Sequence, residues 1–128
     1  MILVDSSGWL EYFSDSANAD FFAEPLNNLE NVIVPAICIY EVFKVVLRER
    51  SENDALMAVS VMMQGKIIDV NSEIAIESAK LSHNHKLPMA DSIILASAEL
   101  YDAEIYTQDK DFRNFNNVHY IKKSKNKK

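Results

Sequence analysis

The sequence predicts an α/β fold in which a central, mainly parallel sheet of four to five strands is covered by helices on both faces. Short apolar runs alternate along the chain with longer stretches whose apolar residues recur at helical spacing. Each apolar run is continuous, as expected of a strand that is buried on both faces of a parallel sheet. The length of 128 residues suits a single domain.

The predicted strands are short and lie well apart in the sequence. In chain order they cover residues 2–4, 31–35, 66–70 and 104–107, with 118–121 as a weaker fifth strand. Pro35 ends the second run, and its fixed backbone angle suits the first turn of the helix that follows. Ligands of such sheets bind beyond the carboxyl ends of the strands.

Six helices are predicted between and beside these strands. They cover residues 7–13, 17–29, 36–50, 51–65, 72–85 and 89–102. Pro25 interrupts the second helix, because proline has no N–H to donate. The helix over 89–102 is apolar nearly all round, which predicts a central, buried position.

The helix over 51–65 begins with a pattern that resembles a capping box. Ser51 and Asp54 have the required spacing, with Asp in place of the usual Glu. We expect its methionines to pack in the core or, alternatively, to line a groove for another subunit or a partner; they are Met57, Met62 and Met63.

Composition bounds the partners and the compartment. The net charge is −6, and five of the thirteen basic residues crowd residues 122–128, which we expect to form a basic, disordered tail. The net charge of −6 by itself argues against nucleic acid as a partner. Residues 1–121, the expected domain, hold eight basic and nineteen acidic residues, a balance of −11. The single cysteine, Cys38, allows no intrachain disulfide and suits the cytoplasm. No signal peptide and no membrane association are expected.

The carboxylate of Asp5 directly follows the first predicted strand, where a charge is expensive to bury. The strand does not need Asp5 in order to end, because Ser6, Ser7 and Gly8 already supply turn chemistry. Two explanations stay open: Asp5 caps the next helix, or it holds a cation.

Glu41 lies in the middle of the predicted helix 36–50. Its neighbours one turn away on either side, Ile37 and Val45, are apolar. An apolar stripe around a charge indicates that the charge faces the core or a cleft. The alternative is a surface pair with Lys44, which we rank second because the helix has little polar surface around Glu41.

Three further acids stand where packing alone would not put them. Asp91 is the only charge in the first two turns of helix 89–102. Asp109 and Asp111 follow the strand 104–107, again at a carboxyl end. Taken singly, each has a structural explanation, because acids stabilise helix N-termini and Asp109 can cap a short helix.

These acids gain significance as a set. Parallel strands place Asp5 and Asp109 at the same edge of the sheet, and the helices that carry Glu41 and Asp91 begin there. Carboxylates in one cleft repel one another unless a cation neutralises them. Oxygen ligands favour Mg²⁺ or Mn²⁺, which activate water and stabilise the leaving oxygen of a phosphodiester. The sequence therefore predicts a metal site formed by Asp5, Glu41, Asp91 and Asp109.

Four blocks of the sequence resemble the PIN-domain ribonucleases, most closely the VapC-like toxins of prokaryotic toxin–antitoxin pairs. The blocks are LVDSSGWLEYF, VPAICIYEV, LPMADSIILASA and IYTQDKDF, and they span Met1 to Phe112 in this order. The resemblance implies a PIN-like α/β/α sandwich, Mg²⁺- or Mn²⁺-dependent cleavage of single-stranded RNA, a homodimer and an antitoxin partner.

The resemblance also assigns roles to single residues. The acidic quartet of the family falls on Asp5, Glu41, Asp91 and Asp109, with Asp5 and Asp91 as the principal metal ligands. Its accompanying hydroxyls, which orient the carboxylates, fall on Ser6 and Thr107. Asp111 is an alternative for the fourth acid, because many relatives have a longer loop at this point. The lysine tail lies outside the family pattern.

Three other functions are alternatives to a ribonuclease toxin. An RNA-processing PIN nuclease without a toxic role would lack an antitoxin gene in the neighbouring reading frame. An inactive PIN-like interaction module would have no need to keep four acids that repel one another. A phosphoacceptor receiver domain fits poorly, because it would need paired acids at Asp5 and a lysine near Thr107.

Overall fold

A computed structural model of the protein describes residues 1–124. Five strands form one sheet in the order β3-β2-β1-β4-β5, and every neighbouring pair is parallel. The strands are β1 (Ile2–Val4), β2 (Val32–Pro35), β3 (Lys66–Ile68), β4 (Glu104–Thr107) and β5 (Val118–Tyr120). The predicted α/β class is confirmed, and the weaker fifth strand is present. Residues 125–128 of the predicted tail lie outside the described residues.

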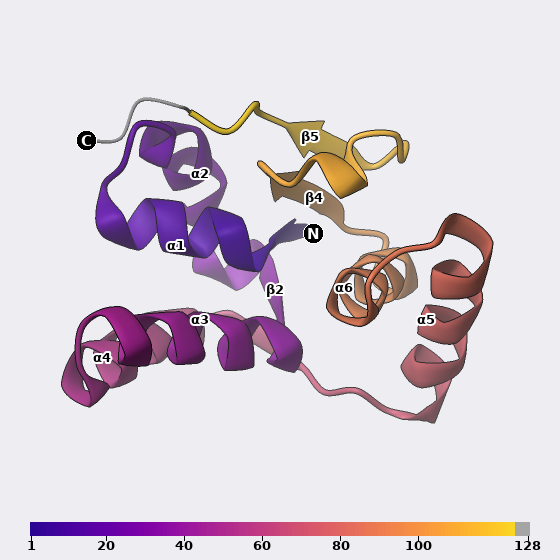
Figure 1. Cartoon of the computed structure of the whole chain (residues 1–128), viewed down its shortest axis with the longest axis horizontal. Coiled ribbons are helices and arrows are strands. Elements are labelled where there is room, and N and C mark those ends of the chain that lie inside the picture. Colours follow the sequence, from indigo (N-terminus) through magenta and orange to yellow (C-terminus); the bar gives the residue numbers. More distant parts are fainter. Residues whose placement is uncertain (125–128) are drawn as a thin grey trace.

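Helices cover the sheet on both sides (Figure 1). The chain runs outward from β1 to β3 and then returns to β4, so right-handed crossovers put the helices of the two halves on opposite faces. The first face carries α1 (Ser6–Ser14), α2 (Ala19–Leu26), α3 (Ala36–Glu49) and α4 (Glu52–Met62), and the second carries α5 (Ser72–His85) and α6 (Met89–Leu100). Within residues 1–124, none of the helices combines the length with the apolar composition that a bilayer crossing requires.

The second predicted helix, over 17–29, differs from the observed one. α2 continues through Pro25 to Leu26, so Pro25 does not interrupt it as predicted, and a separate 3-10 turn, η1 (Leu29–Asn31), begins at the last residue of the predicted stretch. Pro35 is the last residue of β2 and stands just outside α3, in agreement with the predicted strand 31–35 and helix 36–50. β3 is also shorter than predicted, since its pairing with β2 ends where Ile68 meets Pro35.

The sheet is buried on both faces, as its continuous apolar runs predict. Leu3 and Val4 are adjacent in β1 and therefore point to opposite faces, yet both are fully buried. Trp9 of α1 and Phe22 of α2 fill the core on the first face. On the second face five consecutive residues of α6, 94–98, are buried, which confirms the predicted central helix.

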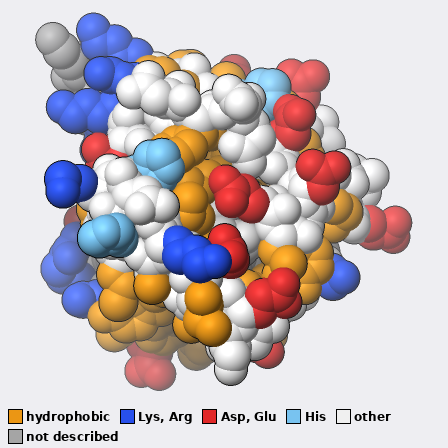
Figure 2. Space-filling model, turned by 90° about the vertical axis from the view of Figure 1, so that its right-hand side faces the viewer, with side chains coloured by type: hydrophobic (Ala, Val, Ile, Leu, Met, Phe, Trp, Pro, Cys, Tyr) orange, Lys and Arg blue, Asp and Glu red, His pale blue; other side chains and the backbone are white. Residues whose placement is uncertain are grey.

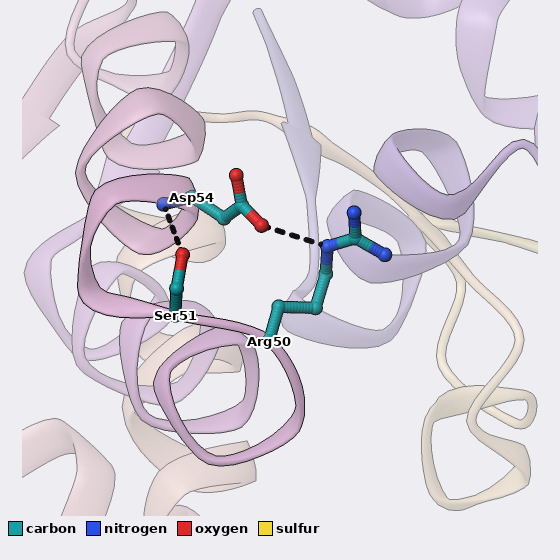
Figure 3. Close-up of polar contacts among 3 residues, drawn as sticks. All are labelled: Arg50, Ser51 and Asp54. Atoms are coloured by element: carbon teal, nitrogen blue, oxygen red, sulfur yellow. Dashed lines mark hydrogen bonds and ion pairs between the residues drawn. The ribbon is translucent and has the colours of Figure 1, made fainter.

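Figure 3 shows the polar contacts at the start of α4. The Ser51 hydroxyl accepts a hydrogen bond from the N–H of Asp54 at 3.0 Å, as predicted for an N-cap. The Asp54 carboxylate does not complete a capping box and instead binds Nε of Arg50 at 3.0 Å. Its side chain is one methylene shorter than that of Glu, so the ion pair with Arg50 takes the place of the bond back to Ser51.

A groove of about 710 Å³, here called the α1/α4 groove, lies between α1 and the pair of helices α3 and α4. Its apolar lining comes from Leu10, Phe13, Val45, Val46, Met57, Ala58 and Val61, and its polar lining from Ser7, Ser14, Glu11, Glu49, Arg50, Asp54, Gln108 and Lys123. Of the three methionines, Met62 is fully buried in the core, whereas Met57 is 61% exposed and Met63 58% exposed. Only Met57 of the exposed pair lines the groove.

Close packing around Gly8 joins α1 to the sheet and to α2. A Cβ atom built at this position would lie 2.6 Å from Cγ1 of Val4 and 2.6 Å from Cε1 of Phe22. Both neighbouring side chains are fully buried and are held by the core. Glycine at this position therefore lets the start of α1 sit directly on β1.

We expect Gly8→Ala to destabilise the protein, although alanine is the better helix former. Overpacking of a well-filled core costs about 1–3 kcal/mol, and we expect a loss of that size in the free energy of unfolding. Urea unfolding measures the change, with Ser14→Ala in the exposed last turn of α1 as the control. An unchanged unfolding midpoint for Gly8→Ala would show that the packing is looser than described.

Candidate metal centre and active site

The adjacent parallel strands β1 and β4 bring two distant polar residues together. Val4 pairs with Tyr106, so the next residues, Asp5 and Thr107, emerge from the same edge of the sheet. The Thr107 hydroxyl donates to Oδ2 of Asp5 at 2.6 Å and accepts from the N–H of Asp109 at 2.8 Å. Thr107 therefore links the carboxylate at the end of β1 to the turn after β4.

Asp5 is both a helix cap and part of this polar cluster. Its Oδ1 accepts from the N–H of Gly8 at 2.9 Å, which caps α1, and from the Ser7 hydroxyl at 2.8 Å. The side chain is almost completely buried. Burial raises the pKa of Asp5 from 3.8 to about 6, although the bonds from Thr107, Gly8 and Ser7 lower it and the charge of Asp109 adds to the rise. The two explanations that the sequence left open for Asp5 do not exclude each other.

Glu41 faces the same edge from α3. Its Oε1 accepts a hydrogen bond from the Ser6 hydroxyl at 2.6 Å. The alternative of a surface pair with Lys44 is wrong, because the ammonium group of Lys44 contacts the hydroxyl and the ring of Tyr40 instead. Glu41 is half-buried and lies at the junction of α1 and α3.

Asp91 lies in the first turn of α6 and completes the approach of the acids from the second face. One carboxylate oxygen each of Asp91, Asp109 and Asp111 lie within 4.8 Å of one another. Partial burial raises the pKa of Asp91 to about 7, and the charges of Asp109, Asp111, Asp5 and Glu41 raise it further, in that order. The pKa of Asp91 thus reflects all four of the other acids.

Asp109 and Asp111 belong to the same turn, η2 (Lys110–Phe112). Asp109 is its N-cap, and its carboxylate accepts the N–H of Asp111 at 2.9 Å. The sequence treated the two acids as alternatives for one position, whereas the structure brings both to Asp91. The bond from the N–H of Asp111 to the Asp109 carboxylate holds the turn in which both acids lie.

Two polar side chains near the site were not singled out from the sequence. Ser7 binds Asp5, while Ser6, which was expected at the site, binds Glu41. Gln108 is buried between Thr107 and Asp109. A serine in a helical first turn and a glutamine in a loop are too common to be noticed without the contacts that they make.

The residues present fit a hard divalent cation. All the donors are carboxylate or hydroxyl oxygens, as Mg²⁺ and Mn²⁺ prefer. The ion pairs found within residues 1–124 join other side chains, so the acids of the cluster have no basic partner among them. A cation would supply the charge that this arrangement lacks.

Comparison with known proteins gives the family. The model of the PIN domain family matches residues 2–118. The chain belongs to the PIN domain family. None of the curated proteins compared with it matches significantly in sequence.

Solved structures resemble this PIN domain over nearly its whole length. A toxin–antitoxin complex from Klebsiella pneumoniae superposes with a TM-score of 0.78 at 28% identity, covering 93% of this chain and 96% of that one. VapC20 of Mycobacterium tuberculosis, described as a sarcin–ricin loop cleaving toxin, has a TM-score of 0.73 at 14% identity and coverages of 92% and 98%. VapBC2 from Rickettsia felis, bound to a promoter DNA fragment, has a TM-score of 0.71 at 15% identity and coverages of 95% and 98%. At 14% and 15% identity the last two show the fold alone.

The raised pKa values predict that the metal-free PIN domain loses stability as the pH rises. Asp5 and Asp91 ionise near pH 6 and 7 in the folded chain but near 3.8 when unfolded, so the folded state binds more protons between these values. Melting in EDTA should therefore occur at a lower temperature at about pH 8 than at about pH 5. Mn²⁺ should raise the melting temperature more at the higher pH, where the carboxylates are ionised.

Asp91→Asn is the matched control for this effect. It removes one of the two raised groups and one source of repulsion, so its melting temperature should depend less on pH and on Mn²⁺. Equal pH profiles for the wild type and Asp91→Asn would rule out Asp91 as a source of the instability.

Proposed function

We propose that this chain is an endoribonuclease that uses Mg²⁺ or Mn²⁺ to hydrolyse phosphodiester bonds in single-stranded RNA, and that it is the toxin of a toxin–antitoxin pair. The single observation that carries the proposal is the cluster of Asp91, Asp109 and Asp111 beside the buried Asp5 in a PIN domain. PIN domains are nucleases, and in this one the acids lie at the carboxyl edge of the sheet.

The roles that we propose within the site are those that the resemblance to the family implies. Asp5 and Asp91 would be the principal ligands, and Glu41 and Asp109 would complete the site and accept a proton from the attacking water. A bound ion would neutralise the carboxylates, activate that water and stabilise the leaving oxygen. Hydroxyl groups hold two of the acids in place, since Thr107 and Ser7 donate to Asp5 and Ser6 donates to Glu41. Asp111 adds negative charge beside Asp91.

Charge explains why an RNA substrate would need the metal ion. Acidic side chains are spread over the face that carries α5 and α6, whereas Lys and Arg lie mainly at its left margin in Figure 2. Residues 1–121 contain eight basic and nineteen acidic side chains. A phosphodiester therefore meets repulsion over much of the surface, and cations between the two anions would relieve it.

The α1/α4 groove is the place that we propose for the antitoxin. A groove with an apolar floor and charges of both signs at its rim suits one face of an amphipathic segment. The relative from Klebsiella pneumoniae, at 28% identity, was solved as a toxin–antitoxin complex. We also propose a homodimer, for which exposed apolar residues such as Met89 and Ile76 provide surface. The buried free thiol of Cys38 is compatible with the cytoplasm as the location.

Cleavage assays on a panel of single-stranded RNAs test the catalytic assignment. We expect Asp5→Asn and Asp91→Asn to fold and to lose cleavage almost completely, because each removes a ligand charge with little change in shape. Wild-type cleavage should stop in EDTA and return with Mg²⁺ or Mn²⁺. Undiminished cleavage in excess EDTA would exclude the metal mechanism, and a purified wild type that cuts no RNA would favour the inactive interaction module.

Asparagine substitutions at the two acids of the η2 turn, Asp109 and Asp111, distinguish a capping role from a catalytic one. Asn caps a turn about as well as Asp but supplies no charge, so Asp109→Asn should fold normally and lose most cleavage. Asp111→Asn, the matched variant two residues away, should retain more activity, because Asp111 is exposed and makes only a supporting contribution of charge. The reverse order would transfer the role of fourth acid to Asp111.

Met57→Glu tests the groove as the antitoxin site. A carboxylate at this exposed position of the groove would be buried without a partner in the complex, so the Kd for the protein encoded beside this chain should rise at least about tenfold. RNA cleavage should be unchanged. Met63→Glu, equally exposed but outside the groove lining, is the control. Calorimetric titration with that partner would measure both, and equal Kd values would place the antitoxin elsewhere.

A further inference from the structure

Gln108 is a buried amide in the middle of the loop that carries two of the acids. It lies between Thr107, which binds Asp5, and Asp109, and it is only 6% exposed. Side chains alternate along an extended segment, so Gln108 points away from Thr107 and toward the α1 side of the sheet. A buried side-chain amide is costly unless its polar atoms are hydrogen-bonded.

Both ends of this amide are bonded to residues that lie far away in the sequence. Its Oε1 accepts from Nδ2 of Asn18 at 2.9 Å, and its Nε2 donates to Oε1 of Glu11 at 3.3 Å. The other oxygen of Glu11 accepts the N–H of Asn18 at 2.9 Å, which closes the ring of three residues. Asn18 also donates to the carbonyl of Lys122 at 3.1 Å. We call Glu11, Asn18 and Gln108 the amide ring.

The end of β4 is therefore held from both faces of the sheet. On one face the Thr107 hydroxyl bonds to Asp5 and to the N–H of Asp109. On the other face Gln108 is bonded to α1 and to the turn after it. The next residue, Asp109, then has little freedom, and its carboxylate caps Asp111.

We propose, building on the nuclease function above, that Gln108 is a positioning residue of the metal site. Through the amide ring it fixes the loop from Thr107 to Asp111, and so sets the distance of Asp109 and Asp111 from Asp91. Groups that orient metal ligands in this way typically change metal affinity or activity by about 10–100-fold when they are removed. The alternative is a purely structural role, in which the ring only fastens the α1–α2 turn to the sheet.

Mn²⁺ affinity measured without RNA separates the two roles. Gln108→Leu keeps the approximate size of the side chain and removes both hydrogen bonds. We expect it to weaken Mn²⁺ binding by about 10–100-fold at a temperature where the protein is fully folded. The electron paramagnetic resonance signal of free Mn²⁺ measures this binding. Asn117→Ala is the matched control, because the Asn117 amide bonds to the carbonyl of Ala103 just before the opposite end of β4.

Exchanging the amide and the carboxylate provides a second, independent test. Gln108→Glu alone puts two carboxylates side by side, and Glu11→Gln alone leaves one acceptor oxygen for two donors, the N–H of Asn18 and Nε2 of Gln108. In the double variant Glu11→Gln/Gln108→Glu every hydrogen bond of the amide ring can form again: Asn18 remains the donor of its two bonds, and only the bond between positions 11 and 108 is reversed. We expect both single variants to bind Mn²⁺ more weakly and the double variant to recover, a coupling that independent sites would not show.

The outcomes divide cleanly. Weaker Mn²⁺ binding in Gln108→Leu but not in Asn117→Ala, with recovery in the double variant, supports the positioning role. Mn²⁺ binding equal to that of the wild type, even with a lower melting temperature, overturns it and leaves the ring a structural tether. Should Gln108→Leu fail to fold, the exchange variants decide by the same criterion. A wild type that neither binds Mn²⁺ nor cuts RNA would refute the proposed function itself. The Mn²⁺ titration of the wild type and the cleavage assay test that function separately from the role of Gln108.

Discussion

The burial of the Asp5 carboxylate is the constraint on which the rest of this structure depends. A charge at the end of a central strand costs free energy, and three donors from Ser7, Gly8 and Thr107 offset that cost. The same three bonds start α1, orient its first turn and join β1 to β4. One carboxylate thus links the sheet, a helix cap and the acid cluster.

The acid cluster extends this constraint across the edge of the sheet. Asp91 approaches from α6 and Glu41 from α3, while Asp109 and Asp111 come from the turn after β4. The protein holds these like charges close together through hydrogen bonds to neighbouring groups rather than through ion pairs. Repulsion from the neighbouring carboxylates, after burial, contributes to the raised pKa of Asp91. A divalent cation would remove this repulsion.

Much of this could be predicted from the sequence because topology carries the information. Continuous apolar runs identify buried parallel strands, and parallel strands put Asp5 and the acids after β4 at one edge. The finer contacts could not be predicted, because they depend on side chains that meet across about a hundred residues, such as Asn18 and Gln108. The short helix capped by Asp109 could be predicted and is present as the turn η2, but the approach of both Asp109 and Asp111 to Asp91 in α6 is a tertiary contact that the local pattern does not specify.

Ser7 lies between the acid cluster and the α1/α4 groove. Its hydroxyl donates to Asp5, and the same residue lines the α1/α4 groove. A ligand in the groove that turns this hydroxyl away from Asp5 changes the affinity of the carboxylate for a cation. Thermodynamic linkage is reciprocal, so the cation must then change the affinity of the groove for that ligand by the same factor. A ligand of this kind would therefore couple occupancy of the groove to occupancy of the metal site.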